Sequence, residues 1–237
     1  MKKLLFSSAC LLLLITSCKK TTPDPAPAPV AATPFMTYAS GTTWDYQTTD
    51  NVTTTVTPYT LTATSVDTAI GTKTYRIFNS VDANGTTEAY YNQTGNDYYE
   101  YTQLSAQLPP IDMKYLSTSA AVGTTWSQPI SVTDSASGVT ITANIKSTIL
   151  DTGFVETVNN ITYNRVIRVK TEITNLATNN LFVTATVESQ NISACYAPKY
   201  GLIKRAFALH VIANSPLGPA DVINNNTTNI LMHSSIQ

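Results

Sequence analysis

The sequence contains few of the residues that usually carry chemistry. Only three of its 237 residues are cysteine and only two are histidine. Cys10 and Cys18 belong to the N-terminal segment, so Cys195 is the single thiol in the rest of the chain and no intramolecular disulfide is expected there. No basic residue stands beside Cys195 in the sequence to lower its pKa, and we interpret it as a small buried hydrophobic residue.

Recognisable motifs for catalysis and metal binding are also missing. His210 and His233 stand alone, without the His-Glu-x-x-His or Cys-x-x-Cys spacing of zinc sites. The sequence has no Gly-x-Ser-x-Gly elbow, no Walker glycine loop and no dinucleotide-binding glycine motif. Paired carboxylates for glycoside cleavage need no local motif, but nothing in the sequence selects a pair. We therefore predict no catalytic residues, no metal and no cofactor, and a carbohydrate-active enzyme is the less favoured alternative.

Charge is scarce and nearly balanced. The chain has 14 Lys plus Arg against 15 Asp plus Glu, and charged residues make up 12% of it. It has no basic stripe that could displace counterions from phosphates, which argues against a nucleic-acid partner. Valine, isoleucine, leucine and tyrosine recur throughout, so the composition is that of a folded chain with a surface rich in hydroxyls and amides.

The N-terminus has the features of a lipoprotein export signal. Two lysines at positions 2 and 3 precede an apolar run, Leu4 to Ile15, that is too short to span about 30 Å of hydrocarbon. The small residues Thr16 and Ser17 then lead into Cys18. This order resembles the bacterial lipobox, which implies a signal peptide over residues 1–17 and diacylglycerol on Cys18. Each buried methylene adds roughly 0.8 kcal/mol of membrane affinity, so we expect Cys18 to anchor the protein.

Residues 18–34 are predicted to be a tether. Prolines at positions 23, 25, 27, 29 and 34 alternate with alanine and threonine. Proline fixes φ and removes backbone donors, so this stretch favours an extended polyproline-II conformation. At about 3.1 Å per residue, it could hold a folded domain roughly 40 to 50 Å from the bilayer.

From residue 35 onward, apolar residues recur at every second position. The clearest examples are Val139 to Ile145, Tyr163 to Lys170 and the second half of Leu181 to Val187. Threonine, valine and isoleucine dominate these segments, and pairs such as Asn84-Gly85 punctuate them as turns. The pattern predicts an all-β, antiparallel fold.

A short repeat suggests that this fold has two halves. Gly41-Thr42-Thr43-Trp44 returns 82 residues later as Gly123-Thr124-Thr125-Trp126. Glycine permits a turn, the threonines begin a strand and the tryptophan can enter a core. We predict a first module over residues 35–118 and a second over 119–237, within one continuous folded domain, with both tryptophans buried.

Tyrosines form the most ligand-like feature of the sequence. Five of them lie on two predicted strands joined by a Gly-Asn-Asp turn, so alternate rings should project from each face of one hairpin. One face could stack on a sugar or line a groove; alternatively, the rings pack the core on one face and stiffen the surface on the other. The five residues are Tyr90, Tyr91, Tyr98, Tyr99 and Tyr101.

Two features together resemble a known family. They are the Gly-x-x-Trp sequences with which two predicted strands begin, and a motif near the C-terminus. The motif is Tyr196-Ala197, three further residues, and then Gly-Leu-Ile-Lys ending at Lys204. With the lipobox and spacer, it resembles uncharacterised outer-membrane lipoproteins of the Bacteroidota. In that family the motif is a strand that closes a curved antiparallel sheet. The resemblance implies a curved antiparallel sheet or an open barrel, and it implies no activity.

Two short matches suggest a modification. Asp67-Thr68-Ala69 and Asp134-Ser135-Ala136 resemble the acceptor sequence of general O-glycosylation in Bacteroidota periplasms. Aspartate followed by a hydroxyl residue also suits an ordinary turn. We expect Thr68 and Ser135 to lie in exposed turns if they are acceptors.

Two classes of function remain open. The favoured one is a non-catalytic, lipid-anchored envelope lipoprotein, a binding or accessory module for an envelope protein, a glycan or a lipid. The alternative is a carrier-like open barrel that holds a lipid or another apolar ligand. An empty apolar cavity would favour the carrier, and a filled core with exposed tyrosines would favour the module. The expected location is the outer membrane; Lys19-Lys20 is not an acidic surface-export signal, which favours the periplasmic face.

Overall fold

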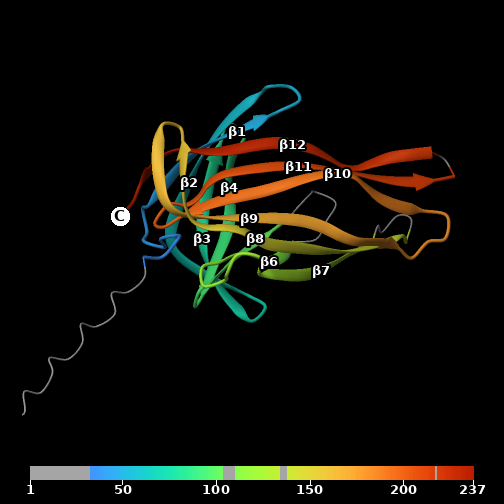
Figure 1. The fold of residues 1–237 in the computed structure, drawn as a ribbon, viewed down its shortest axis with the longest axis horizontal. Coiled ribbons are helices and arrows are strands. Elements are labelled where there is room, and N and C mark those ends of the chain that lie inside the picture. The colour runs from blue at the N-terminus through green and yellow to red at the C-terminus, as the bar shows by residue number, and fades with distance from the viewer. Residues whose placement is uncertain (1–32, 104–109, 134–137, 217) are drawn as a thin grey trace, which may run out of the picture. The chain divides into compact units, whose positions relative to one another are not determined.

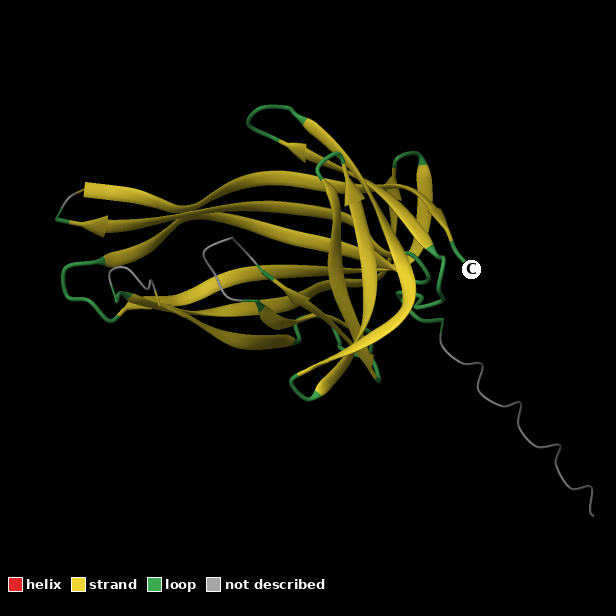
Figure 2. Ribbon diagram, turned by 180° about the vertical axis from the view of Figure 1, so that it is seen from behind, coloured by secondary structure: helices red, strands yellow, loops and turns green. Residues whose placement is uncertain are grey.

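The computed structural model describes residues 33–103, 110–133, 138–216 and 218–237, all within one compact unit, Thr33–Gln237. The regular elements of these residues are β-strands (Figure 2). They are β1 (Thr43–Asp50), β2 (Val56–Ile70), β3 (Lys73–Asp82), β4 (Gly85–Thr94), β5 (Asp97–Thr102), β6 (Ile111–Ser117), β7 (Thr125–Thr133), β8 (Thr140–Val158), β9 (Ile161–Thr178), β10 (Thr184–Ala197), β11 (Gly201–Ser215) and β12 (Gly218–Ser235). Within these described residues, no helix is long and apolar enough to cross a membrane. The expected signal peptide, Cys18 and most of the tether lie outside the described residues.

The twelve strands form one antiparallel sheet in the order β6-β5-β4-β3-β2-β1-β12-β11-β10-β9-β8-β7. Strands β1 to β6 make one meander and β7 to β12 a second, and pairing of β1 with β12 joins them. The long strands of the second meander cross β2 to β4 at a steep angle (Figure 1). The sheet curves so far that its edge strands meet: the indole N–H of Trp126 in β7 donates to the carbonyl of Lys114 in β6 at 2.7 Å. The predicted all-β, curved antiparallel sheet or open barrel is confirmed.

The repeated Gly-Thr-Thr-Trp sequence has the same local structure in both places. Gly41 and Gly123 have φ angles of 86° and 85°, which glycine adopts without strain. The N–H of Gly41 donates to the carbonyl of Ala63 in β2 at 2.9 Å, and the N–H of Gly123 donates to the carbonyl of Ile149 in β8 at 2.8 Å. Trp44 is fully buried, but Trp126 is only half-buried. The expectation of two buried tryptophans is therefore wrong for Trp126, because β7 is an edge strand with one neighbour.

The C-terminal motif forms a hairpin and does not close the sheet. β10 ends at Ala197 and β11 begins at Gly201, whose φ is 67°. β11 lies between β10 and β12, and the two meanders are joined by β12 and β1 instead. The N–H of Gly201 donates to the carbonyl of Phe35 at 2.5 Å, and Met36 forms a bridge with Tyr200. The hairpin therefore fixes the beginning of the described chain against the sheet.

Buried apolar side chains gather in two clusters. The larger contains Trp44, Phe78 and Leu116 and fills the region where the first meander meets the starts of β9 and β11. Cys195 is buried in the same cluster, as expected. The buried residues of the smaller cluster, which include Ile145 and Leu209, belong to the second meander, and Ile111 and Met113 of β6 pack against them. These side chains surround an empty space.

Candidate functional site

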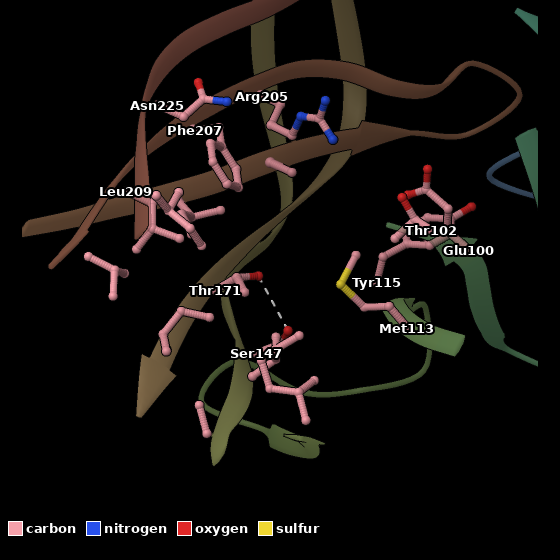
Figure 3. Close-up of a pocket in the computed structure, with 18 of the residues that line it drawn as sticks. Glu100, Thr102, Met113, Tyr115, Ser147, Thr171, Arg205, Phe207, Leu209 and Asn225 are labelled. Carbon is pink, nitrogen blue, oxygen red and sulfur yellow. Dashed lines mark hydrogen bonds between the residues drawn. The ribbon is translucent and has the colours of Figure 1, made fainter. Parts of the chain in front are cut away.

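An apolar cavity of about 330 Å³, which we call the apolar chamber, lies between the second meander and strands β5 and β6 of the first (Figure 3). Inward-facing residues of β8 to β12 form one wall, and residues of β6 and β7 face them. Most inward positions carry short branched side chains or alanine, which leave the middle of the chamber open. Its apolar lining comprises Met113, Ile130, Ile141, Ala143, Ile145, Val169, Ile173, Leu176, Ile192, Ala194, Phe207, Leu209, Val211, Val222 and Ile223.

Two of the polar groups in this wall are partners of each other. The hydroxyls of Ser147 and Thr171 lie 3.3 Å apart on adjacent strands and hydrogen-bond to each other (Figure 3). A hydroxyl satisfied by a neighbouring hydroxyl makes no demand on a ligand. The wall therefore presents a hydrocarbon-like surface.

A second cavity, of about 270 Å³, lies inside the first meander; we call it the tyrosine chamber. The rings of Tyr46 and Tyr59 stack there with centroids 5.1 Å apart. The Tyr46 hydroxyl donates to the carbonyl of Leu202 at 2.9 Å, and the Tyr59 hydroxyl accepts from Asn229 at 2.6 Å. Its lining comprises Met36, Tyr46, Tyr59, Leu61, Ser80, Thr87, Ala89, Tyr91, Glu100, Tyr115, Tyr196, Leu202 and Arg205.

Four residues line both chambers and mark their junction: Glu100, Tyr115, Tyr196 and Arg205. Glu100 and Arg205 are the two charged residues in either lining, and they project from β5 and β11 on facing parts of the sheet (Figure 3). Burial raises the pKa of the Glu100 carboxyl, although the positive charge of Arg205 opposes the shift. The Tyr91 hydroxyl donates to Glu100 at 3.4 Å, which is a long hydrogen bond.

The structure separates the five predicted tyrosines onto two faces of the β4–β5 hairpin. Tyr91 lines the tyrosine chamber and packs edge-on against Phe78 at 5.0 Å. Tyr98 is buried, and its hydroxyl accepts from the N–H of Phe35 at 2.9 Å. Tyr90, Tyr99 and Tyr101 lie on the opposite face, as strand alternation requires.

The outer tyrosines pack against one another and against β3 and β6. The Tyr90 and Tyr101 rings are paired at 6.2 Å, and the ammonium of Lys73 lies 3.2 Å from the centre of the Tyr99 ring. Asp112 pairs with Lys73 and accepts from the Tyr75 hydroxyl at 2.5 Å. These contacts hold the rings in a close-packed outer layer.

The two expected acceptor residues are not both placed in turns. Thr68 lies within β2, opposite Tyr75 of β3, and is half-buried. The expectation that Thr68 lies in an exposed turn is wrong, because pairing with β3 resumes at Asp67, after an irregularity, and continues to Ile70. Ser135 lies outside the described residues.

Other chemistry-bearing residues are dispersed over the surface. The His210 ring contacts Asp221 at 2.8 Å, and His233 lies 3.5 Å from Asp45. Among the described residues, no group of three or more His, Cys, Asp or Glu could hold a metal ion. Glu100 is the only carboxylate in the lining of either chamber, so no pair spaced for glycoside cleavage occurs in these cavities.

Sequence reasoning did not single out Glu100 and Arg205. A signal for Arg205 was present, because it stands in phase with Phe207, Leu209 and Val211, which alternate on the apolar face of one strand. Glu100 is similarly in phase with Tyr98. A charged residue at an apolar position of an alternating strand lowers stability unless the charge is paired or reaches water, so such a position is a signal worth following.

No protein-family model matches the chain, and no curated protein matches its sequence. Among solved structures, a candidate lipoprotein from Parabacteroides distasonis is similar, with 11% identity and a TM-score of 0.50 over 87% of this chain and 100% of that one. A candidate exported protein with a YmcC-like fold from Bacteroides fragilis has 8% identity and a TM-score of 0.48, over 86% and 100% of the two chains. The protein from Parabacteroides distasonis shares the fold of the chain described above.

Proposed function

We propose that the protein is a non-catalytic, lipid-anchored envelope lipoprotein that binds an apolar or amphiphilic ligand inside its curved sheet. The apolar chamber carries this proposal. Its volume of about 330 Å³ falls in the range of small-molecule sites, and its lining is predominantly aliphatic. Of the two functions that the sequence left open, an empty apolar cavity supports the carrier-like one.

The outer tyrosines give less support to a binding module. Their rings already contact each other and Lys73, and Tyr75 beneath them has no exposed surface. A ligand that stacked on these rings would have to displace existing contacts. The apolar chamber offers unfilled surface, and enclosing a hydrocarbon chain there would remove apolar area from water at roughly 25 cal/mol per Å².

Filling the apolar chamber should weaken the binding of a neutral apolar probe. Ala143 lines the chamber, and we expect Ala143→Phe to raise the dissociation constant of N-phenylnaphthylamine about tenfold, equivalent to about 1.4 kcal/mol. The measurement is probe fluorescence with the mature chain from Lys19 onward, which contains every described residue. Ala177→Phe is the matched control, because Ala177 is exposed on β9. Equal affinities of the two variants would contradict the proposal.

The anchor and the envelope location are supported by the sequence. Lipidation requires a positively charged N-terminus, a short apolar run and small residues before the cysteine, and the sequence has all three ahead of Cys18. The structural relative from Parabacteroides distasonis is described as a candidate lipoprotein. We propose attachment to the outer membrane, with the folded domain on the periplasmic side.

Replacing Cys18 should abolish the anchor. In Cys18→Ala no thiol is available to receive diacylglycerol, so the protein should stall as a precursor or leave the membrane fraction. Mass spectrometry of the N-terminal peptide, with Cys195→Ala as the control, checks this. An unmodified thiol at Cys18 in the unaltered protein would contradict it.

A further inference from the structure

The junction of the two chambers contains a permanent positive charge, the half-buried guanidinium of Arg205. Arg205 projects from β11 to the junction of the two chambers. Among the described residues, no hydrogen bond or ion pair engages its guanidinium, and Glu100 lies beyond ion-pair distance. An arginine cannot lose its proton in a protein, so this charge persists at every relevant pH.

Arg205 is half-buried, and a charge partly withdrawn from water without a partner is costly, so its presence calls for a physical reason. A guanidinium offers five donors in a planar fork that matches the oxygens of carboxylate and phosphate groups.

Tyr115 and Tyr196 line the same junction, and Tyr91 lies beside it in the tyrosine chamber. Burial raises the pKa of each, so all three remain neutral hydroxyls able to donate hydrogen bonds. The Tyr91 hydroxyl donates to Glu100 and the Tyr115 hydroxyl donates to the sulfur of Met36. Among the described residues, the donors left without a partner at the junction are the Arg205 guanidinium and the Tyr196 hydroxyl.

We propose that the ligand is an amphiphile whose anionic oxygen head group pairs with Arg205 at the junction while its hydrocarbon chain occupies the apolar chamber. This inference rests on the proposed function, because the ligand's hydrocarbon chain must enter the apolar chamber for its head group to reach Arg205. Fatty acids and phosphate-headed lipids share this chemistry. The anionic head group would contact the guanidinium of Arg205, and the hydrocarbon tail would contact aliphatic side chains. The charged and the apolar parts of the site therefore match the two ends of such a molecule.

Glu100 limits the affinity for such a head group. It is the other charged residue of the junction and has the same sign as the ligand. Like charges in an interior of low dielectric repel one another strongly. Removing the Glu100 charge should therefore strengthen anion binding, whereas removing the Arg205 charge should weaken it. The opposite directions of these two effects separate an electrostatic role from general damage to the fold.

The test compares two ligands with the same chain and different heads, dodecanoate and dodecanol. Each displaces N-phenylnaphthylamine from the mature chain at neutral pH. Dodecanoate should bind about tenfold more tightly than dodecanol, as a charge-assisted hydrogen-bonded pair would give. Arg205→Gln should lose this preference and keep the affinity for dodecanol, Arg205→Lys should retain part of it, and Glu100→Gln should increase it.

Several results would overturn the inference. If dodecanol and dodecanoate bind equally to the unaltered protein, or if Arg205→Gln keeps the preference, the head group does not pair with Arg205 although the proposed function stands. If neither ligand nor the probe binds, both proposals fail. Dodecyl phosphate should behave as dodecanoate does, and inorganic phosphate alone should not displace the probe. Displacement by inorganic phosphate would show a simple anion site and exclude an amphiphile.

Discussion

Trp44→Ala is expected to lower the free energy of unfolding by roughly 3 to 5 kcal/mol, the usual cost of truncating a large buried aromatic side chain. Trp44 has no exposed surface, and its ring lies 5.8 Å from that of Phe78 in the larger cluster. The residues around Trp44 cannot easily move in to fill the cavity that Trp44→Ala leaves, because β1 is paired on both sides, with β2 and β12. Unfolding in urea, followed by circular dichroism, measures the change.

Two further variants sharpen this prediction. Trp126→Ala should cost less, roughly 1 to 2 kcal/mol, because Trp126 is half-buried and loses mainly its hydrogen bond to Lys114 and the ammonium 4.8 Å from its ring. Trp44→Phe should recover much of the loss, since the buried indole N–H of Trp44 has no hydrogen-bond partner. Equal costs for the two alanine variants would contradict the assigned difference in burial.

The fold class was predictable because alternation survives in most strands. All of Val139 to Ile145 except Val139 falls within β8, and Tyr163 to Lys170 falls within β9, which confirms those strands. Strand lengths were not predictable. β8 runs for 19 residues, but register shifts near Ile149, Thr152 and Phe154 reverse the phase of its side chains, so the sequence shows only short alternating pieces.

The candidate site was only partly visible in the sequence for a related reason. The tyrosine hairpin depends on local alternation and a turn, so the two faces of its rings could be predicted. The apolar chamber depends on which strands meet across the curved sheet, and Met113 and Ile145 are brought together by pairing between distant segments.

The surroundings of Cys195 also differ from those expected from its neighbours in the sequence. Register places Arg168 and Lys204 opposite it, although burial still raises the pKa of its thiol.

Glu100→Gln is expected to make the protein more stable than the unaltered chain at neutral pH, with the difference vanishing in acid. Burial raises the pKa of Glu100 above its ordinary value near 4.5, so the folded state holds this proton more tightly than the unfolded state. Glu100 therefore contributes stability that is fully present below pH 4.5 and is lost as pH rises through the folded-state pKa. Glutamine cannot ionise, so Glu100→Gln should keep this stability at neutral pH. The loss in the unaltered protein amounts to about 1.4 kcal/mol of unfolding free energy for each pH unit by which the pKa is raised.

The groups that face Glu100 leave this prediction intact. Arg205 of β11 keeps its charge, and the tyrosines turned toward Glu100 from β2, β4, β6 and β10 stay neutral because burial raises the pKa of each one. Asp50→Asn is the matched control with the opposite sign. Backbone N–H groups of Thr53 and Val52 lower the pKa of Asp50, so that variant should lose stability at neutral pH and match the unaltered chain in strong acid. Urea unfolding midpoints between pH 2 and pH 8 compare the three proteins. If the stability of Glu100→Gln follows that of the unaltered chain across this range, the carboxyl is not the buried, disfavoured charge that the junction requires.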